Sequence, residues 1–189
     1  MPNEILVKTK VEYSFQSSAY SPTGNNDLSS GTPTTVDLTL DEGGTGLAVA
    51  EAINSDLLDL GATRPGRLDV TAAIEFFAAI VAGSKVSFYW SPSANSGVAV
   101  GNPGHPDGVD GAYTGDGGGT VAESVKQLQF IGNFITTDLQ GVQIAYVGWF
   151  EPHQRYGQLI VVNDTATVIC GTDDIESSVL MSGIISEIQ

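Results

Sequence analysis

The stretch Arg67–Phe77, RLDVTAAIEFF, decides the fold class of this chain. Apolar side chains occupy every second position along it, at Leu68, Val70, Ala72, Ile74 and Phe76. Alternation with a period of two is the pattern of a β-strand that buries one face. The stretch therefore predicts a strand with a hydrophobic core on one side.

Comparable segments lie on both sides of this strand and are rich in β-branched and aromatic residues. They cover residues 9–15, 34–40, 85–90, 125–135, 142–150, 158–163, 165–169 and 179–188. Clusters of Gly, Pro, Asn and Asp separate them, as is typical of turns. Roughly eight to ten short strands of this kind predict an all-β domain, folded as an antiparallel β-sandwich or jelly roll.

One segment, Leu47–Leu60, has a helical pattern instead. Its apolar residues recur at steps of three and four, at Leu47, Ala50, Ile53, Leu57 and Leu60. Gly61 is placed to end a helix, although Asn54–Asp56 interrupts it with poor helix formers. We expect a helix here.

A long glycine-rich stretch follows the predicted strand at residues 85–90. Gly101–Thr120, GNPGHPDGVDGAYTGDGGGT, contains eight glycines, two prolines and three aspartates. Glycine loses much backbone entropy on ordering, and proline cannot donate to a sheet ladder. The stretch therefore predicts a long, exposed and flexible loop that lies outside the main subunit contact.

The length of 189 residues fits one domain. Residues 1–33 are expected to form an N-terminal strand followed by a polar extended arm, and residues 34–189 the β-sandwich domain. The arm, Gln16–Pro33, has few apolar side chains and is expected to reach another molecule. On this interpretation, deletion of residues 1–33 leaves the domain folded.

The charge balance narrows the range of partners. The chain has 22 acidic and 7 basic residues and a net charge of −15, so we expect no binding to nucleic acid. It has no Lys/Arg run and no stretch of 18 apolar residues, so we expect no membrane association. The first residues, MPNE, lack a signal-peptide pattern, which predicts synthesis in a cytoplasm. Divalent cations, basic protein surfaces and neutral sugars remain as partners, although the acidity is equally explained by solubility.

Residues with catalytic chemistry are sparse. Cys170 is the single cysteine, and His105 and His153 are the only histidines. None of them lies in a metalloprotease or nucleophile-elbow motif, and Gly115–Gly119 lacks the Lys-Ser/Thr of a phosphate-binding loop. We therefore expect no enzyme, no catalytic residue and no cofactor.

Two sets of residues are candidates for binding. Asp107, Asp110 and Asp116 in the glycine-rich stretch are a weak candidate Ca²⁺ site, against the simpler interpretation of a solvated loop. The interface candidates are aromatic residues at strand ends and two residues of a turn, namely Trp90, Trp149, Arg155 and Tyr156. Arg and aromatic residues are enriched at interface hot spots, whereas exposed aromatics also stack on sugars.

Several segments together resemble a known group of proteins. These segments are Asp59–Arg64, Val70–Glu75, Phe88–Pro92, Gly111–Thr114, Ser124–Gly132, Tyr146–Gly148 and Arg155–Asn163. In this order they resemble uncharacterised virion proteins of tailed bacteriophages, over roughly residues 55–189.

The resemblance implies a structural role in the phage particle, as a decoration or cement protein on the head. The implied partners are the major capsid protein and further copies of this chain, most simply in a homotrimer. The implied location is the virion, after synthesis in the host cytoplasm. The alternative is a carbohydrate-binding β-sandwich module of a tail or receptor-binding apparatus.

Overall fold

The computed structural model describes residues 5–23, 26–28, 30–41, 45–97, 101–117, 119–170 and 175–188. Within these ranges the side chains of residues 5–9 and 186–188 are not described. The strands are β1 Ile5–Gln16, β2 Thr34–Asp37, β3 Ala52–Asn54, β4 Leu58–Asp59, β5 Leu68–Phe76, β6 Lys85–Ser93, β7 Gly111–Ala112, β8 Gln129–Ile135, β9 Gly141–Phe150, β10 Tyr156–Asn163 and β11 Ser178–Ile188. A short helix, α1 Val121–Ser124, continues into a 3₁₀ turn, Val125–Gln127.

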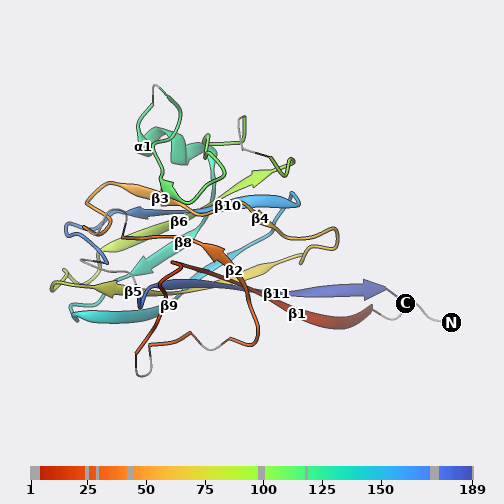
Figure 1. Ribbon diagram of the computed structural model, residues 1–189, viewed down its shortest axis with the longest axis horizontal. Helices are drawn as coiled ribbons and strands as arrows, with labels where there is room; N and C mark the ends of the chain where they lie inside the picture. Colours follow the sequence, from red (N-terminus) through yellow and green to blue (C-terminus); the bar gives the residue numbers. More distant parts are fainter. Residues whose placement is uncertain are drawn as a thin grey trace.

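The strands form one curled mixed sheet (Figure 1). Their order is β2-β1-β11-β5-β9-β8-β6-β10-β3-β7, and β4 also pairs with β10. The β1–β2 pair is parallel, and the other ladders are antiparallel. The predicted all-β class is confirmed. The alternating stretch Arg67–Phe77 contains β5, and its apolar side chains at every second position are buried.

The sheet bends where β8 meets β9. These strands share a single residue pair, Gly132 with Gly148. A Cβ atom on Gly132 would lie 2.1 Å from the carbonyl oxygen of Val147, and one on Gly148 would lie 2.5 Å from that of Ile131. Irregular register occurs at the same place in the β6–β8 and β5–β9 ladders. Because only glycine permits this approach, the two halves of the sheet can turn toward each other here.

The core lies between the two halves of the sheet. Phe76 of β5 packs on Phe134 of β8 with ring centroids 6.0 Å apart, and Trp90 of β6 packs on Phe150 of β9 at 5.1 Å. Trp90 fits because position 157 has no side chain, since a Cβ there would lie 2.3 Å from the indole. The core thus joins strands on either side of the β8–β9 meeting point, each pair separated by one strand in the sheet order.

The glycine-rich stretch is mostly exposed, as predicted, but part of it packs on the sheet. Residues 101–117 and 119–128, here called the cover segment, pack on the outer face of β10 and β3 as a second hydrophobic cluster (Figure 1). Tyr113 is 2% exposed, and its hydroxyl donates to the carbonyl of Gly104. Thr120 and Glu123 form a capping box that starts α1. Tyr113 and this helix therefore anchor part of a stretch whose other described residues are largely exposed.

The predicted helix at Leu47–Leu60 is wrong. The segment contains a bridge at Leu47, a turn at Ala50 with φ of +63°, and the strands β3 and β4. All three residues of β3 are buried, so apolar side chains point to both faces and the period of two is lost. This double burial, between the core and the cover segment, produces spacing that imitates a helix.

The N-terminal region also differs from the expected arm. β1 lies within the sheet, between β11 and β2, and its Phe15 is fully buried. The following segment packs back on the domain: Ser21 donates its backbone N–H to the carbonyl of Ile175, and Gly31 donates to the carboxylate of Glu12. The part that protrudes is instead a ribbon of the outer ends of β1 and β11 (Figure 1).

We predict that deletion of residues 1–33 abolishes folding. The deletion removes the partner of β11 along its whole length, together with buried Tyr13 and Phe15. Phe15→Ala alone is expected to cost about 3–5 kcal/mol. Urea denaturation followed by near-ultraviolet circular dichroism checks this, and a cooperative transition in the deleted protein would contradict it.

We also predict that Gly148→Ala lowers the free energy of unfolding by at least about 2 kcal/mol, because the added Cβ meets a backbone carbonyl that cannot rotate away. Gly66→Ala is the control, since a Cβ there meets no atom within 4 Å; its effect should stay within about 0.5 kcal/mol. Equal urea midpoints for the two variants would show that the glycine crossing is not a constraint.

Candidate interaction site

The two outer faces of the sheet differ in what covers them. The cover segment lies over β10 and β3, whereas apolar side chains of β9 and β11 are exposed on the other half. Four of these residues share one face and are between 47% and 56% exposed, namely Ile144, Tyr146, Trp149 and Ile184. We call this set the β9 patch. Exposed apolar side chains gathered on one face of a sheet are typical of an interaction site.

The β9 patch contains an ordered polar cluster. Arg67 lies over the ring of Trp149, 4.6 Å from its centroid, and pairs with Asp69 at 2.6 Å. The hydroxyl of Tyr146 donates to the same Asp69 oxygen over 3.0 Å. The hydrogen bond to Asp69 raises the pKa of Arg67. These contacts hold two aromatic rings in fixed positions, which lowers the entropy cost of binding to them.

A second cluster of the same type lies at the start of β10. Arg155 makes two hydrogen bonds to the carboxylate of Asp59, of 2.8 and 2.7 Å, and lies over the ring of Tyr156. The hydrogen bond from Arg155 holds the pKa of Asp59 below its usual value. Arg64 donates to the carbonyl of Pro152 nearby. All three arginines of the chain therefore lie in or beside the loops at one end of the sheet.

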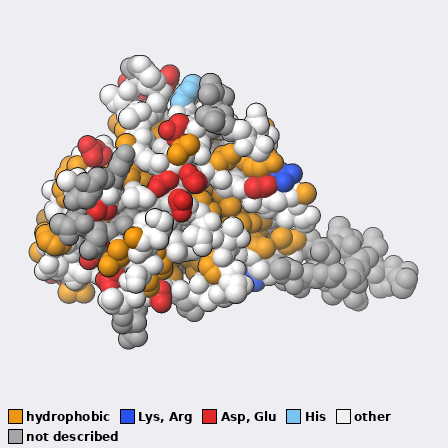
Figure 2. Space-filling model, viewed as in Figure 1, with side chains coloured by type: hydrophobic (Ala, Val, Ile, Leu, Met, Phe, Trp, Pro, Cys, Tyr) orange, Lys and Arg blue, Asp and Glu red, His pale blue; other side chains and the backbone are white. Residues whose placement is uncertain are grey.

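Acidic side chains gather beside β2. The backbone N–H of Asp110 donates to the carboxylate of Asp56, and the backbone N–H of Asp56 donates to the carbonyl of Asp37. Burial raises the pKa of Asp110, and the charges of Asp56 and Asp37 act in the same direction. Figure 2 shows acidic side chains grouped near the centre of this face. A groove of about 290 Å³ runs between β2 and residues 56–59.

The structure divides the four interface candidates. Trp149 and Arg155 are exposed and Tyr156 is half-buried. Trp90 is fully buried in the core, so its side chain is not available to a partner. The prediction that Trp90 is an interface residue is therefore wrong. The alternation of β6 places Trp90 and Phe88 inward, whereas Tyr89 packs on Phe130 outside.

The three aspartates proposed for Ca²⁺ are held separately. A carboxylate oxygen of Asp107 accepts from Asn54, and one of Asp110 accepts from the backbone of Thr39. The backbone N–H of Asp116 donates to the hydroxyl oxygen of Ser124. Across the described ranges, no group of three or more His, Cys, Asp or Glu residues is arranged to hold a metal ion. His105 and His153 are both exposed.

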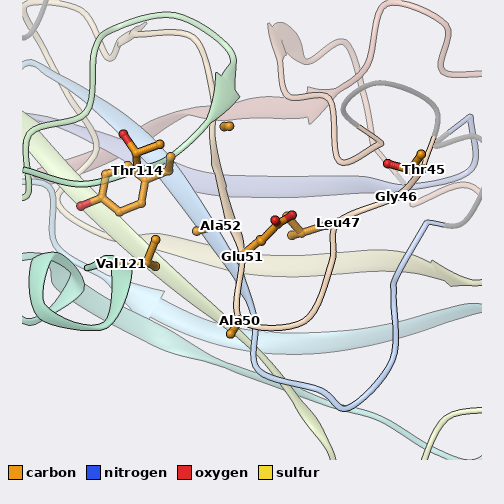
Figure 3. Close-up of a pocket in the computed structure, with 10 residues that line it drawn as sticks. Thr45, Gly46, Leu47, Ala50, Glu51, Ala52, Thr114 and Val121 are labelled. Carbon is orange, nitrogen blue, oxygen red and sulfur yellow. The ribbon is translucent and has the colours of Figure 1, made fainter. Parts of the chain in front are cut away.

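A cleft of about 450 Å³ opens between the cover segment and the turn before β3. Figure 3 shows Thr114 and Val121 on one side and Thr45 and Leu47 on the other. Glu51 is the one charged residue among those that line it. The other polar side chains of the lining are the hydroxyl-bearing Thr45, Tyr113 and Thr114.

No family model, curated protein or solved structure matches this chain. Among the described residues, no helix is long and apolar enough to cross a membrane. The site therefore has to be interpreted from its own geometry.

Sequence reasoning missed Arg67, Asp69 and Tyr146. Asp69 is 77 positions from Tyr146 in the chain, and the β5–β9 register that joins them includes an irregularity beside Val70. The one feature of the sequence that points to Asp69 as a site residue is its position on the polar face of the alternating stretch Arg67–Phe77. A partner across the sheet is not deducible from that position alone.

Burial raises the pKa of Tyr113 to about 12, which predicts a pH dependence of stability. The unfolded tyrosine loses its proton near pH 10, while the folded one keeps it up to about pH 12. Stability is therefore complete below pH 10 and falls between pH 10 and 12, by roughly 2–3 kcal/mol. Tyr113→Phe should lack this component, so melting curves at pH 9 to 12 compare the two proteins. Parallel losses in both would contradict the assignment to Tyr113.

Proposed function

We propose that this protein is a non-enzymatic structural protein of a bacteriophage particle, which decorates the head by binding the major capsid protein and associates with itself. The observation that carries the assembly role is the β9 patch. One outer face of the sheet is covered by the chain's own cover segment, while the other presents aromatic and aliphatic side chains without such a cover. The assignment to a phage head is supported by the resemblance of the segments between residues 55 and 189.

The chemistry of the patch supports a protein partner. Trp, Tyr and Arg are the residue types most enriched at interface hot spots, and Trp149, Tyr146 and Arg67 lie together here. Asp69 links Arg67 to Tyr146, so the polar groups of the patch enter an interface already hydrogen-bonded. A partner therefore covers the patch without stranding a charge.

We further propose that the two halves of the curled sheet act as the two layers of a β-sandwich of jelly-roll type. The Phe76–Phe134 and Trp90–Phe150 contacts between the halves support this arrangement. A two-layer core gives the outer face a rigid support, which favours a preformed interface.

A carbohydrate-binding module is the second candidate, and Trp149 beside Tyr146 and Asp69 favours it, because sugars stack on exposed rings and hydrogen-bond to carboxylates. The position of Arg67 argues against it. The guanidinium already lies over the Trp149 ring, on the surface that a sugar would need.

Trp149→Ala tests the proposal. Purified chain is mixed with heads of the phage that encodes it, prepared without this gene, and the bound fraction is measured by sedimentation. We expect wild-type protein to bind and Trp149→Ala to bind at least tenfold more weakly, because hot-spot truncation typically costs about 2 kcal/mol or more. The melting temperature should change little, since the ring is 49% exposed.

Phe77→Ala is the matched control, because Phe77 is an exposed aromatic residue just after β5 and outside the patch. This variant should bind like wild type. Failure of the wild-type chain to bind heads, together with its absence from complete particles, would overturn the capsid role. Trp149-dependent binding to a glycan array would establish the carbohydrate alternative instead.

A further inference from the structure

The cleft between the cover segment and the turn before β3 lies on the half of the sheet away from the β9 patch. Its volume of about 450 Å³ is within the usual range of small-molecule sites. Three of its lining residues are buried, namely Leu47, Ala52 and Tyr113, whereas Glu51 and Thr114 are exposed. The cleft therefore has an apolar interior between the two hydrophobic clusters and opens to solvent.

Many hydrogen-bond donors of the lining are already used within the chain. The backbone N–H groups that donate to other parts of the protein are those of Gly46, Leu47, Ala50, Glu51 and Tyr113. The hydroxyl of Tyr113 also donates, to a carbonyl of the cover segment. Among the described residues that line the cleft, none is Lys, Arg or His. An anion would therefore meet no cationic partner here and few free donors.

A free acceptor lies in the same place. The carboxylate of Glu51 forms neither an ion pair nor a hydrogen bond within the described ranges of the chain. Figure 3 shows Glu51 between Val121 on one side of the cleft and Leu47 on the other. Asp41 places a second carboxylate beside the lining, where it accepts from the backbone N–H of Gly46. Together with the net charge of −15, these carboxylates favour a cation over a neutral or negative ligand.

The walls of the cleft favour a cation that carries an apolar part. Leu47 on one side, and Val121 with the ring of Tyr113 on the other, are apolar surfaces. A hydrated inorganic cation would leave them in contact with water, whereas an alkyl chain would cover them. The described residues also contain no group of three or more His, Cys, Asp or Glu arranged to hold a metal ion.

We propose that this cleft binds a primary alkylammonium group. The ammonium pairs with the carboxylate of Glu51, and the alkyl stem lies along Leu47 and Val121. A primary ammonium has three N–H donors, and the hydroxyl oxygens of Thr45 and Thr114 are further acceptors in the lining. The site goes beyond the proposed structural role and does not depend on it, because the β9 patch lies on the other half of the sheet.

A titration of the ¹⁵N-labelled chain tests this, with n-butylammonium, 1-butanol and butyrate as probes that share a four-carbon stem. We expect n-butylammonium to shift the backbone amide signals of Leu47, Glu51, Thr114 and Val121 in a saturable manner. It should bind at least about tenfold more tightly than 1-butanol, because a hydrogen bond to a charged group is stronger than one between neutral groups. Butyrate should produce no saturable shift. Equal affinities for n-butylammonium and 1-butanol, or no saturable shift at the cleft, would overturn the proposal.

Glu51→Gln separates the ion pair from the shape of the cleft. This variant should bind n-butylammonium at least about tenfold more weakly and 1-butanol as wild type does. Glu151→Gln is the matched control, because it removes the same charge at an exposed position outside the cleft and should bind like wild type. Equal losses in the two variants would show that only the overall charge of the protein attracts the amine. Melting curves establish that both variants are folded.

Two further probes examine the stem and the source of the ammonium. Methylammonium has the same charge without the stem and should bind at least about tenfold more weakly than n-butylammonium; equal binding would overturn the role of the apolar walls. Nα-acetyl-lysine N-methylamide carries the four-carbon ammonium on a peptide unit. Binding as tight as that of n-butylammonium would identify a lysine side chain of a partner as the source, and its exclusion would identify a free amine. Head binding does not enter these titrations, so failure of this site would leave the decoration role standing, and the reverse also holds.

Discussion

The close approach of Gly132 and Gly148 is the constraint on which the rest of the structure depends. A side chain at either position would collide with a backbone carbonyl, so only this pair of residues lets β8 and β9 cross. Ile131 and Val147, the residues just before them, fall at irregularities of register and are buried. The crossing bends the sheet so that its two halves share one core, which explains how strands that are not hydrogen-bonded neighbours in the sheet pack ring against ring.

The bend also creates two outer faces that differ in how far the chain itself covers them. On one, Tyr113 and the short helix hold the cover segment over Ile160 and Val162. On the other, the side chains of Tyr146 and Trp149 stay about half exposed although they are ordered by Asp69 and Arg67. The cover segment thus buries the outer face over β10 and β3, whereas Phe130 and Ile135 of β8 also remain exposed.

The sequence predicted the parts of the fold that depend on local pattern. β5 follows from strict alternation, because its two faces differ in environment. β3 could not be predicted this way, because the core and the cover segment bury both of its faces. The glycine-rich stretch is anchored by Tyr113, by α1 and by hydrogen bonds such as that from Asn54 to the carbonyl of Val109, none of which leaves a periodic signal. The contact of Asp69 with Tyr146 depends on cross-strand register, which composition and spacing do not encode.

The distribution of charge favours some orientations of two approaching copies of this chain over others. With a net charge of −15, copies of this chain repel each other over most of their surfaces. Five of the seven basic residues lie in the ribbon or in the loops of residues 59–68 and 150–156, namely Lys8, Lys10, Arg64, Arg67 and Arg155. Electrostatic repulsion between the acidic surfaces of two copies disfavours contacts elsewhere. Two copies therefore approach each other most favourably through the surfaces that carry these five basic residues. In the proposed assembly, charge selects the orientation of a partner, while the exposed apolar residues of the β9 patch supply most of the affinity.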